Sequence, residues 1–151
     1  MNINIRTAAP ADAFVIAGFN DAMAKETEGL DLERKRLLKG VEAVLADSNK
    51  GFYYVAEVNG KIVGQLMITF EWSDWRNATF WWIQSVYVVP EYRKQGVFRS
   101  LYRHTESLAK QRGDVCGLRL YVEQENEHAQ KTYEALGMRP SRYQMMEVDF
   151  L

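Results

Sequence analysis

Alternation of apolar and polar residues, together with short apolar runs, predicts β-strands along much of the chain. Asn59-Gly60 separates two such stretches and is a strong hairpin signal, because both positions of the turn need a positive φ. The two flanking strands are therefore expected to pair antiparallel. The predicted strands are residues 2–6, 52–58, 61–72, 78–89, 116–122 and 142–150.

Apolar residues at helical spacing fill the stretches between these strands. Pro10 suits a first helical turn, Asp31 and Asn126 are good N-cap residues, and Gly113 and Gly137 favour helix ends. A helix between the strands 78–89 and 116–122 implies a right-handed crossover and a parallel pair. Without repeats or a long linker, we expect one mixed α/β domain over residues 1–151. The predicted helices are residues 10–25, 31–46, 96–112 and 126–136.

Composition narrows the function classes. The 19 Lys and Arg residues nearly balance the 20 Asp and Glu residues, which argues against a partner such as nucleic acid or a membrane surface held by bulk charge. The single Cys116 excludes an internal disulfide and a cysteine zinc site, and His104 and His128 lack metal-ligand spacing, so no metal is expected. No apolar run reaches the roughly 20 residues of a membrane span, and no secretion signal is present, so we expect a cytoplasmic protein.

The stretch of residues 83–103 predicts a strand, a turn and a helix, and its turn carries the chemistry. Residues 91–96 deliver two cations and a glycine to a helix N-terminus. A helix start exposes unpaired backbone N–H groups and the positive end of the helix dipole, and glycine lets a phosphate approach the backbone. The turn therefore predicts a site for a phosphorylated cofactor. The alternative is a surface turn whose charges are merely solvated.

Two motifs carry a resemblance that covers nearly the whole chain. The turn reads Arg93-Lys94-Gln95-Gly96-Val97-Phe98, and about thirty residues later a strand is followed by Asn126, Ala129, Tyr133, Gly137 and Met138. Their spacing resembles the Arg/Gln-x-x-Gly-x-Gly/Ala and Asn-x-x-Ala-x-x-x-Tyr-x-x-x-Gly-Phe motifs of the GNAT superfamily of acyl-CoA-dependent N-acyltransferases. Phe98 replaces a small residue of the family pattern, and Met138 replaces its final Phe.

The resemblance implies a central mixed, mostly antiparallel sheet of six to seven strands, with about four flanking helices and a parallel strand pair that splays apart. It implies acetyl-CoA as co-substrate, with the pantetheine arm pairing along one strand as an added strand would. The phosphates would lie on N–H groups of the turn, and an N–H near Val86 to Val88 would contact the oxyanion. The implied cofactor-binding residues are Val86, Tyr87, Val88, Arg93, Lys94, Gln95, Gly96, Val97, Phe98, Arg99, Asn126 and Tyr133.

The resemblance also suggests catalytic residues. Tyr133 stands where the family places a general acid near the cofactor sulfur, although it lies on the apolar stripe of its helix and would also suit an ordinary core position. Asn126 is expected to cap its helix and is a candidate for cofactor contact. Many relatives carry a carboxylate base on the third long strand, but this strand offers only Gln84, which could orient a water. Unranked substitutes are Glu71, Glu125 and Glu147, or an amine that enters neutral.

The predicted function is transfer of an acetyl group to a primary amine within a ternary complex. A non-catalytic acyl-CoA-binding module is the alternative, and a nucleotide-binding domain is weakened because no full glycine fingerprint is present. The acceptor, a small molecule or a peptide amine, is open, and a homodimer through the tryptophan-rich strand is compatible with the sequence. Cys116 reads as a buried apolar thiol rather than a nucleophile. Residues that suit a cationic or aromatic amine are Glu26, Glu28, Trp72, Trp75 and Tyr143.

Overall fold

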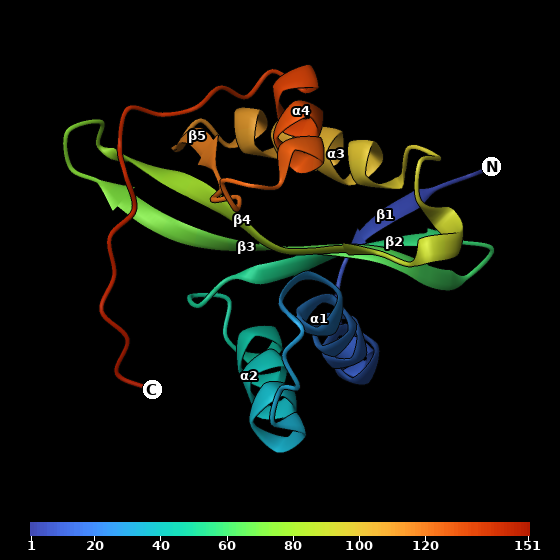
Figure 1. Ribbon diagram of the computed structural model, residues 1–151. Coiled ribbons are helices and arrows are strands. Elements are labelled where there is room, and N and C mark those ends of the chain that lie inside the picture. Colours follow the sequence, from blue (N-terminus) through green and yellow to red (C-terminus); the bar gives the residue numbers. More distant parts are fainter. The chain divides into compact units, whose positions relative to one another are not determined.

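The computed structural model describes residues 1–151, which form two compact units, residues 1–120 and 121–151. The first unit contains the whole β-sheet and three α-helices, and the second contains one α-helix (Figure 1). The expectation of a single domain stays a prediction.

The sheet of the first unit has five strands in the order β1-β2-β3-β4-β5. Neighbouring strands pair antiparallel except for β4 and β5, which pair parallel. The predicted mixed, mostly antiparallel sheet is confirmed, with five strands instead of six to seven. The strands are β1 (Asn4–Thr7), β2 (Phe52–Val58), β3 (Lys61–Ser73), β4 (Ala78–Val88) and β5 (Val115–Arg119).

The hairpin between β2 and β3 forms as the sequence predicts. Asn59 has a φ of 51° and Gly60 a φ of 77°, so both turn residues adopt the left-handed conformation that a tight two-residue hairpin requires. This turn fixes the register of two strands that are largely buried, and it places β3 at the centre of the sheet.

Helices cover both faces of the sheet (Figure 1). On one face lie α1 (Ala13–Glu28), which follows a 3-10 turn at Pro10–Asp12, and α2 (Arg34–Ala46). Their apolar stripes pack on β2, where Ala13, Ile16, Val41, Tyr53 and Val55 form a buried core. The predicted N-cap Asp31 is wrong, because the Glu33 carboxylate accepts the N–H groups of the first turn of α2 instead.

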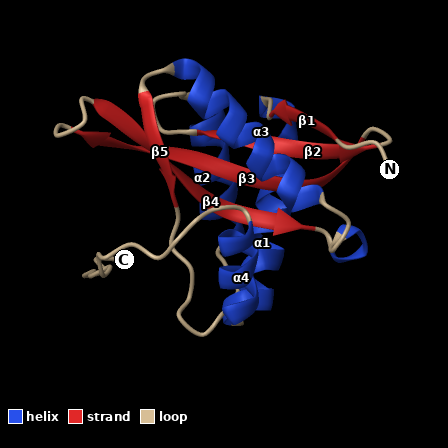
Figure 2. Ribbon diagram, turned by 90° about the horizontal axis from the view of Figure 1, so that it is seen from above, coloured by secondary structure: helices blue, strands red, loops and turns tan.

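The opposite face carries α3 (Val97–Arg112), which lies over the strands when the sheet is viewed from above (Figure 2). Gly64 of β3 permits this close approach: a Cβ there would lie 2.9 Å from Val97 Cγ1 and 3.3 Å from the Tyr87 carbonyl oxygen. Val97 and Leu101 are fully or almost fully buried at this contact. The contact holds the N-terminus of α3 over the middle of the sheet.

The second unit contains α4 (Glu127–Ala135). The Asn126 side chain accepts a hydrogen bond from the Ala129 N–H at 3.1 Å, so the predicted cap is confirmed, and Gly137 has a φ of 106° just beyond the helix. The predicted strand at residues 142–150 is wrong, because that segment pairs with no strand. Its alternating pattern is a local signal, whereas a strand also needs a neighbour that accepts its hydrogen bonds.

The Gly64 contact predicts a specific loss of stability. Gly64→Ala should lower the free energy of unfolding by about 1–3 kcal/mol, because the new methyl group overpacks against Val97. The matched control is Gly18→Ala in α1, where nothing lies within 4 Å of a new Cβ. The control should be neutral or slightly stabilising, since alanine favours helix more than glycine does. Urea unfolding of both variants checks this, and equal stabilities would contradict the close approach of α3.

Candidate functional site

Strand β4 has a neighbour on both edges for only part of its length. Its parallel pairing with β5 runs from Thr79 opposite Val115 to Trp82 opposite Arg119 and ends there. From Ile83 to Val88 the strand pairs with β3 alone. The expected splayed parallel pair is therefore present, and it leaves an open edge along residues 83–88.

The open edge presents backbone groups in a defined order. The Val89 N–H donates to the Val63 carbonyl oxygen at 2.9 Å, and Tyr87 lies opposite Gln65. Because successive residues of a strand direct their N–H and C=O groups to opposite sides, Val86 and Val88 direct theirs away from β3. One of these groups is already used, since the Val88 carbonyl oxygen accepts a 2.8 Å hydrogen bond from Arg93 Nε.

A β-bulge lies at the start of this edge. The register passes from Tyr87 opposite Gln65 to Gln84 opposite Met67, so two residues of β4, Ser85 and Val86, face one residue of β3. Ser85 has a φ of 51°, which costs a non-glycine residue on the order of 1–2 kcal/mol. The bulge also shifts the alternation of side chains, so that residues beyond it point to the opposite face of the sheet from the one that a regular strand would give them.

Contacts on the α1 face confirm that shift. Gln84 donates to Thr69 Oγ1 at 2.6 Å, on the face of β3 that also carries Gln65 and Met67. Tyr87, three residues further along, stacks against Phe19 of α1 with ring centroids 5.2 Å apart. In a regular strand, residues three apart point to opposite faces, so the extra residue at Ser85 is what turns Tyr87 toward α1.

Two residues in the left-handed conformation shape the turn between β4 and α3. After the 3-10 turn at Pro90–Tyr92, Lys94 and Gly96 adopt left-handed conformations with φ values of 60° and 87°. Alternating left-handed residues turn successive N–H groups toward one point, and the first N–H groups of a helix have no intrahelical acceptor. The first helical bond of α3 is donated by the Ser100 N–H to the Gly96 carbonyl oxygen at 3.0 Å. The turn is therefore suited to bind an anion.

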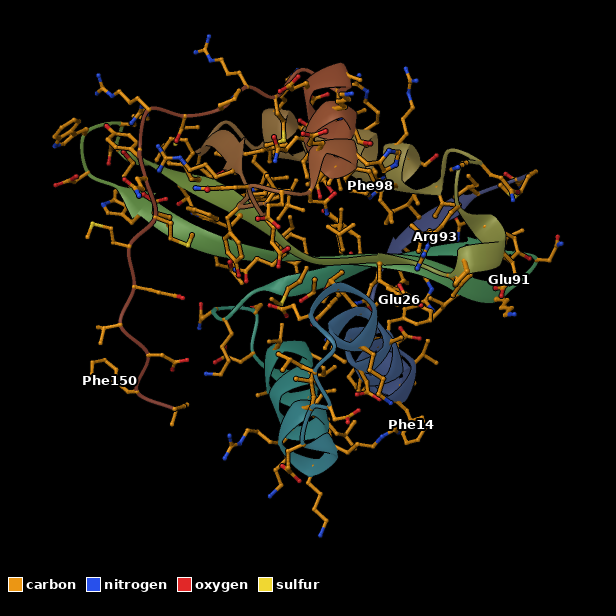
Figure 3. The ribbon with its side chains drawn as sticks, viewed as in Figure 1. Phe14, Glu26, Glu91, Arg93, Phe98 and Phe150 are labelled. Carbon is orange, nitrogen blue, oxygen red and sulfur yellow. The ribbon has the colours of Figure 1, made fainter.

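Arg93 does not point its charge into that turn. Figure 3 shows it reaching from the turn toward Glu26 at the end of α1, and its Nη2 lies 2.8 Å from Glu26 Oε2. The Tyr87 hydroxyl donates to the other Glu26 oxygen at 3.2 Å, and burial, then the charge of Glu26, raises the pKa of Tyr87. Glu26, Tyr87 and Arg93 thus form one cluster. Lys94 and Arg99, both exposed, are the cations of the turn that remain available to an anion.

Glu71, one of the candidate bases, is held as a charged partner. It accepts hydrogen bonds from Trp82 Nε1 at 2.8 Å and from Arg119 Nη1 at 2.8 and 3.0 Å. The Trp82 hydrogen bond, followed by Arg119, lowers the pKa of Glu71 below its ordinary value. A general base works best with a pKa near the working pH, so this environment opposes that role. The Arg119 partner was not predicted, because the two residues lie far apart in the sequence.

The second unit holds the remaining candidates. Asn126 caps α4, and burial raises the pKa of the Tyr133 hydroxyl, so this tyrosine is a neutral hydrogen-bond donor at neutral pH. Their roles at a cofactor stay predictions. Glu125, Tyr143 and Glu147 are exposed within this unit, and Cys116 of the first unit is half-buried.

No group of three or more His, Cys, Asp or Glu side chains is arranged to hold a metal ion. None of the helices combines the length and the apolar character that a membrane crossing requires.

Comparison with known proteins places this geometry in a family. The family model described as "Acetyltransferase (GNAT) family" matches residues 18–138. The chain belongs to the GNAT acetyltransferase family. A crystal structure described as a possible acetyltransferase from Clostridium difficile 630 is 47% identical, with a TM-score of 0.94, and the match covers 100% of this chain and 99% of that one. The GNAT fold predicted from the two motifs is thereby confirmed.

Curated relatives agree at the level of the family. The uncharacterized N-acetyltransferase YhfO of Bacillus subtilis (strain 168) is 29% identical over 139 residues, which cover 89% of each protein. Thialysine N-epsilon-acetyltransferase of Bos taurus is 34% identical over 76 residues, which cover 50% of this chain and 44% of the bovine enzyme. This chain therefore matches less than half of the length of the bovine enzyme.

The bulge in β4 is the feature of this GNAT site that the sequence reading missed. Its signal is weak but present: the polar pair Gln84-Ser85 interrupts an otherwise apolar stretch from Ile83 to Val89. Polar residues inside a mostly apolar central strand suggest a local change of side-chain phase.

The charged state of Glu71 predicts a pH-dependent contribution to stability. A lowered pKa in the folded state means that the carboxylate stabilises the fold above its ordinary pKa of 4.5, and that this is lost as pH falls through the folded value. Glu71→Gln should therefore cost up to about 1 kcal/mol at pH 7, since the pair is partly exposed, and nothing once the carboxyl is protonated. Glu42→Gln, at an exposed residue without a salt bridge, is the control. Urea unfolding at pH 7 and at a pH where the carboxyl is protonated measures the cost in free energy of unfolding. An equal cost of Glu71→Gln at both pH values would contradict the ion pair.

Proposed function

We propose that this GNAT protein transfers the acetyl group of acetyl-CoA directly to a primary amine within a ternary complex. The observation that carries the proposal is the open edge of β4 at Val86–Val88, together with the turn at Lys94 and Gly96 that follows it. An extended arm with amide groups suits the first, and a diphosphate suits the second. A GNAT-fold neighbour from Clostridium acetobutylicum, 19% identical with a TM-score of 0.78, is described as a predicted acetyltransferase with acetyl-CoA, which supports this choice of co-substrate.

The chain's own residues fit such a co-substrate without rearrangement of the strand. For the arm, the open edge offers the Val86 C=O and the Val88 N–H, because the Val88 carbonyl oxygen is taken by Arg93 and the Val86 N–H is kept for the acetyl oxygen. The amides of a pantetheine arm would pair with these groups as a neighbouring strand would. Lys94 and Arg99 would add charge near the diphosphate, while Arg93 would hold the end of the open edge by its bonds to Val88 and Glu26.

The reaction needs a defined movement of atoms and protons. A bond forms between the amine nitrogen and the acetyl carbon, the bond between that carbon and sulfur breaks, and the sulfur leaves as a thiol after it gains a proton. We assign the donation of that proton to the Tyr133 hydroxyl, which the family motif places at this position. The Val86 N–H would donate to the carbonyl oxygen as negative charge develops on it.

The amine must lose a proton, and β4 carries no acid that could accept it. Gln84 is bound to Thr69 at 2.6 Å and could orient a water but not take up its proton. We propose that the amine reacts in its neutral form or passes its proton to water. Glu125 and Glu147 remain as substitutes, whereas the ion pair of Glu71 with Arg119 argues against Glu71.

The acceptor is proposed to be a small cationic or aromatic amine. Glu26 provides a carboxylate at the end of α1 beside Tyr87, whereas Trp72 and Trp75, 62% and 86% exposed, lie at the other end of β4, where Trp72 pairs with Thr79. The two ends of the strand are too far apart to bind one small amine together, so we assign the acceptor to the Glu26 end. Carboxylates and aromatic faces both attract an ammonium group. The partial match to a thialysine acetyltransferase agrees with an acceptor of this class.

The second candidate is a non-catalytic acyl-CoA-binding module, and the Gln84 position favours it. Thiol release with acetyl-CoA and a broad panel of amines, after CoA binding has been confirmed, separates the two. An acetyltransferase releases thiol with at least one amine of the panel. Tight binding with no release for any amine would favour the binding module.

Tyr133 gives a direct test of the proton donor. Tyr133→Phe should lower turnover by roughly 10²-fold or more, because general acid catalysis contributes about 10²–10⁴-fold, while the affinity for CoA stays the same. Tyr121→Phe, at a tyrosine that is 61% exposed, is the matched control. Steady-state rates with an accepted amine and calorimetric titration with CoA are the two measurements. An unchanged rate in a folded Tyr133→Phe protein would remove the proposed role.

Lys94 tests the diphosphate site. Lys94→Asn removes the charge but keeps a residue that tolerates a positive φ, so the turn should persist. CoA affinity should fall by about three- to tenfold, as expected for the loss of roughly 1 kcal/mol from one exposed charge, and the loss should shrink at high salt. Lys110→Asn, near the C-terminal end of α3, should leave the affinity unchanged. Equal affinities for both variants would place the diphosphate elsewhere.

A further inference from the structure

A buried polar network lies directly beneath the bulge of β4. Gln65 of β3 is fully buried, and its Nε2 donates both to the Ser85 carbonyl oxygen at 3.0 Å and to Asn20 Oδ1 at 2.8 Å. Asn20, also buried, donates to the Tyr53 hydroxyl at 3.2 Å. The network therefore ties three elements, α1, β2 and β3, to a single carbonyl group of β4.

Burying this polar network in the middle of the sheet costs free energy. Buried amides cost free energy unless every polar atom is paired, and Gln65 Oε1 has no hydrogen-bond partner in the structure. An apolar side chain at residue 65 would avoid that cost and would continue the apolar packing of Val63, which is fully buried on the same face of β3. What such a side chain would lose is the hydrogen bond to Ser85.

That hydrogen bond controls a group on the opposite side of β4. The Ser85 carbonyl and the Val86 N–H belong to one peptide unit, which is trans because the chain has no cis peptide bond. In a planar trans peptide the C=O and the N–H point in opposite directions. When Gln65 holds the Ser85 oxygen on its own side, the Val86 N–H must point away from Gln65, toward the open edge.

We propose that Gln65 is a positioning residue for the transfer reaction: it holds the Ser85–Val86 peptide so that the Val86 N–H is aimed at the thioester oxygen. This inference rests on the proposed function for its catalytic part. Donation to the Ser85 oxygen also polarises the peptide, which makes the Val86 N–H a stronger donor. Asn20 and Tyr53 support Gln65 from α1 and β2 and keep its amide in the orientation that donates to Ser85.

The decisive variant is Gln65→Met, which keeps the volume of the side chain and removes the donor. Turnover at saturating acetyl-CoA and amine should fall by roughly ten- to a hundredfold, because the Val86 N–H is no longer aligned with the thioester oxygen. The affinity for CoA, which lacks the acetyl group, should change by less than about twofold, since the turn at Lys94 and Gly96 is untouched. The control is Val55→Ala, at a fully buried residue of β2 that lies opposite Gln65 and is separated from β4 by β3. It should lower stability without lowering turnover selectively.

A second variant distinguishes positioning from general packing. Adding Ser85→Gly to Gln65→Met should restore much of the lost turnover, because glycine adopts a positive φ without help and lets the bulge persist. If Gln65 served only the core, the second substitution would restore nothing. Asn20→Ala, which leaves the bond between Gln65 and Ser85 possible, should give a smaller loss and replaces Gln65→Met if that variant fails to fold.

The conformation of the peptide can be tested even without turnover. In the unliganded protein, NMR couplings and chemical shifts of Ser85 should report a positive φ in the wild type and its loss in Gln65→Met. The Val86 amide resonance should differ between the CoA and acetyl-CoA complexes in the wild type and much less in the variant. The inference would be overturned if Gln65→Met kept the Ser85 couplings of the wild type, or if its turnover equalled that of the wild type. Failure of the wild type to bind CoA would instead overturn the proposed function and leave the Ser85 result to decide the role of Gln65.

Discussion

A strand inside a sheet normally pairs along both edges, and unpaired N–H and C=O groups attract whatever can complete the ladder. Strand β4 breaks this rule after Trp82, where its pairing with β5 stops while its pairing with β3 continues. The proposed site depends on this divergence. It creates a one-sided edge that would suit an extended, amide-bearing arm. The chain leads directly from the end of that edge into a turn whose free N–H groups suit an anion.

Several costs are concentrated around this edge, and each is offset by a nearby contact. Ser85 adopts an unfavourable backbone conformation, and a fully buried glutamine holds its carbonyl group. Val88 would expose a carbonyl oxygen, and Arg93 covers it while binding Glu26. The close approach of α3 requires Gly64, which makes room for Val97. Strain of this kind persists only where the surrounding structure holds it in place, and it is often found at functional sites.

Much of the fold could be predicted from the sequence because its signals are local. Asn59-Gly60 specifies its hairpin by the φ values that it tolerates, and Asn126 specifies a helix start by one hydrogen bond. The errors arise where a partner decides. Residues 142–150 alternate as a strand does but have no strand beside them, and Glu33 rather than Asp31 caps α2 because the helix begins later than expected. The pattern alone does not determine whether a second strand is available.

The features of the site also divide into those that a local sequence signal suggests and those that depend on distant residues. The proposed anion site could be suggested from the sequence, because a glycine and cations directly before a helix start are local features. The partners of Arg93 and Glu71 were not, because Glu26 and Arg119 come from distant segments of the chain. The role of Gln65 was hidden for a further reason. It acts through the peptide between Ser85 and Val86, and no motif records the orientation of a peptide group.

A crystal structure of the acetyl-CoA complex tests the central claim most directly. The account predicts that the pantetheine amides pair with the Val86 C=O and the Val88 N–H, that the diphosphate lies against the N–H groups from Lys94 to Arg99, and that the Val86 N–H points at the thioester oxygen. A diphosphate bound away from this turn, or a pantetheine arm that does not pair with the edge of β4, would contradict it.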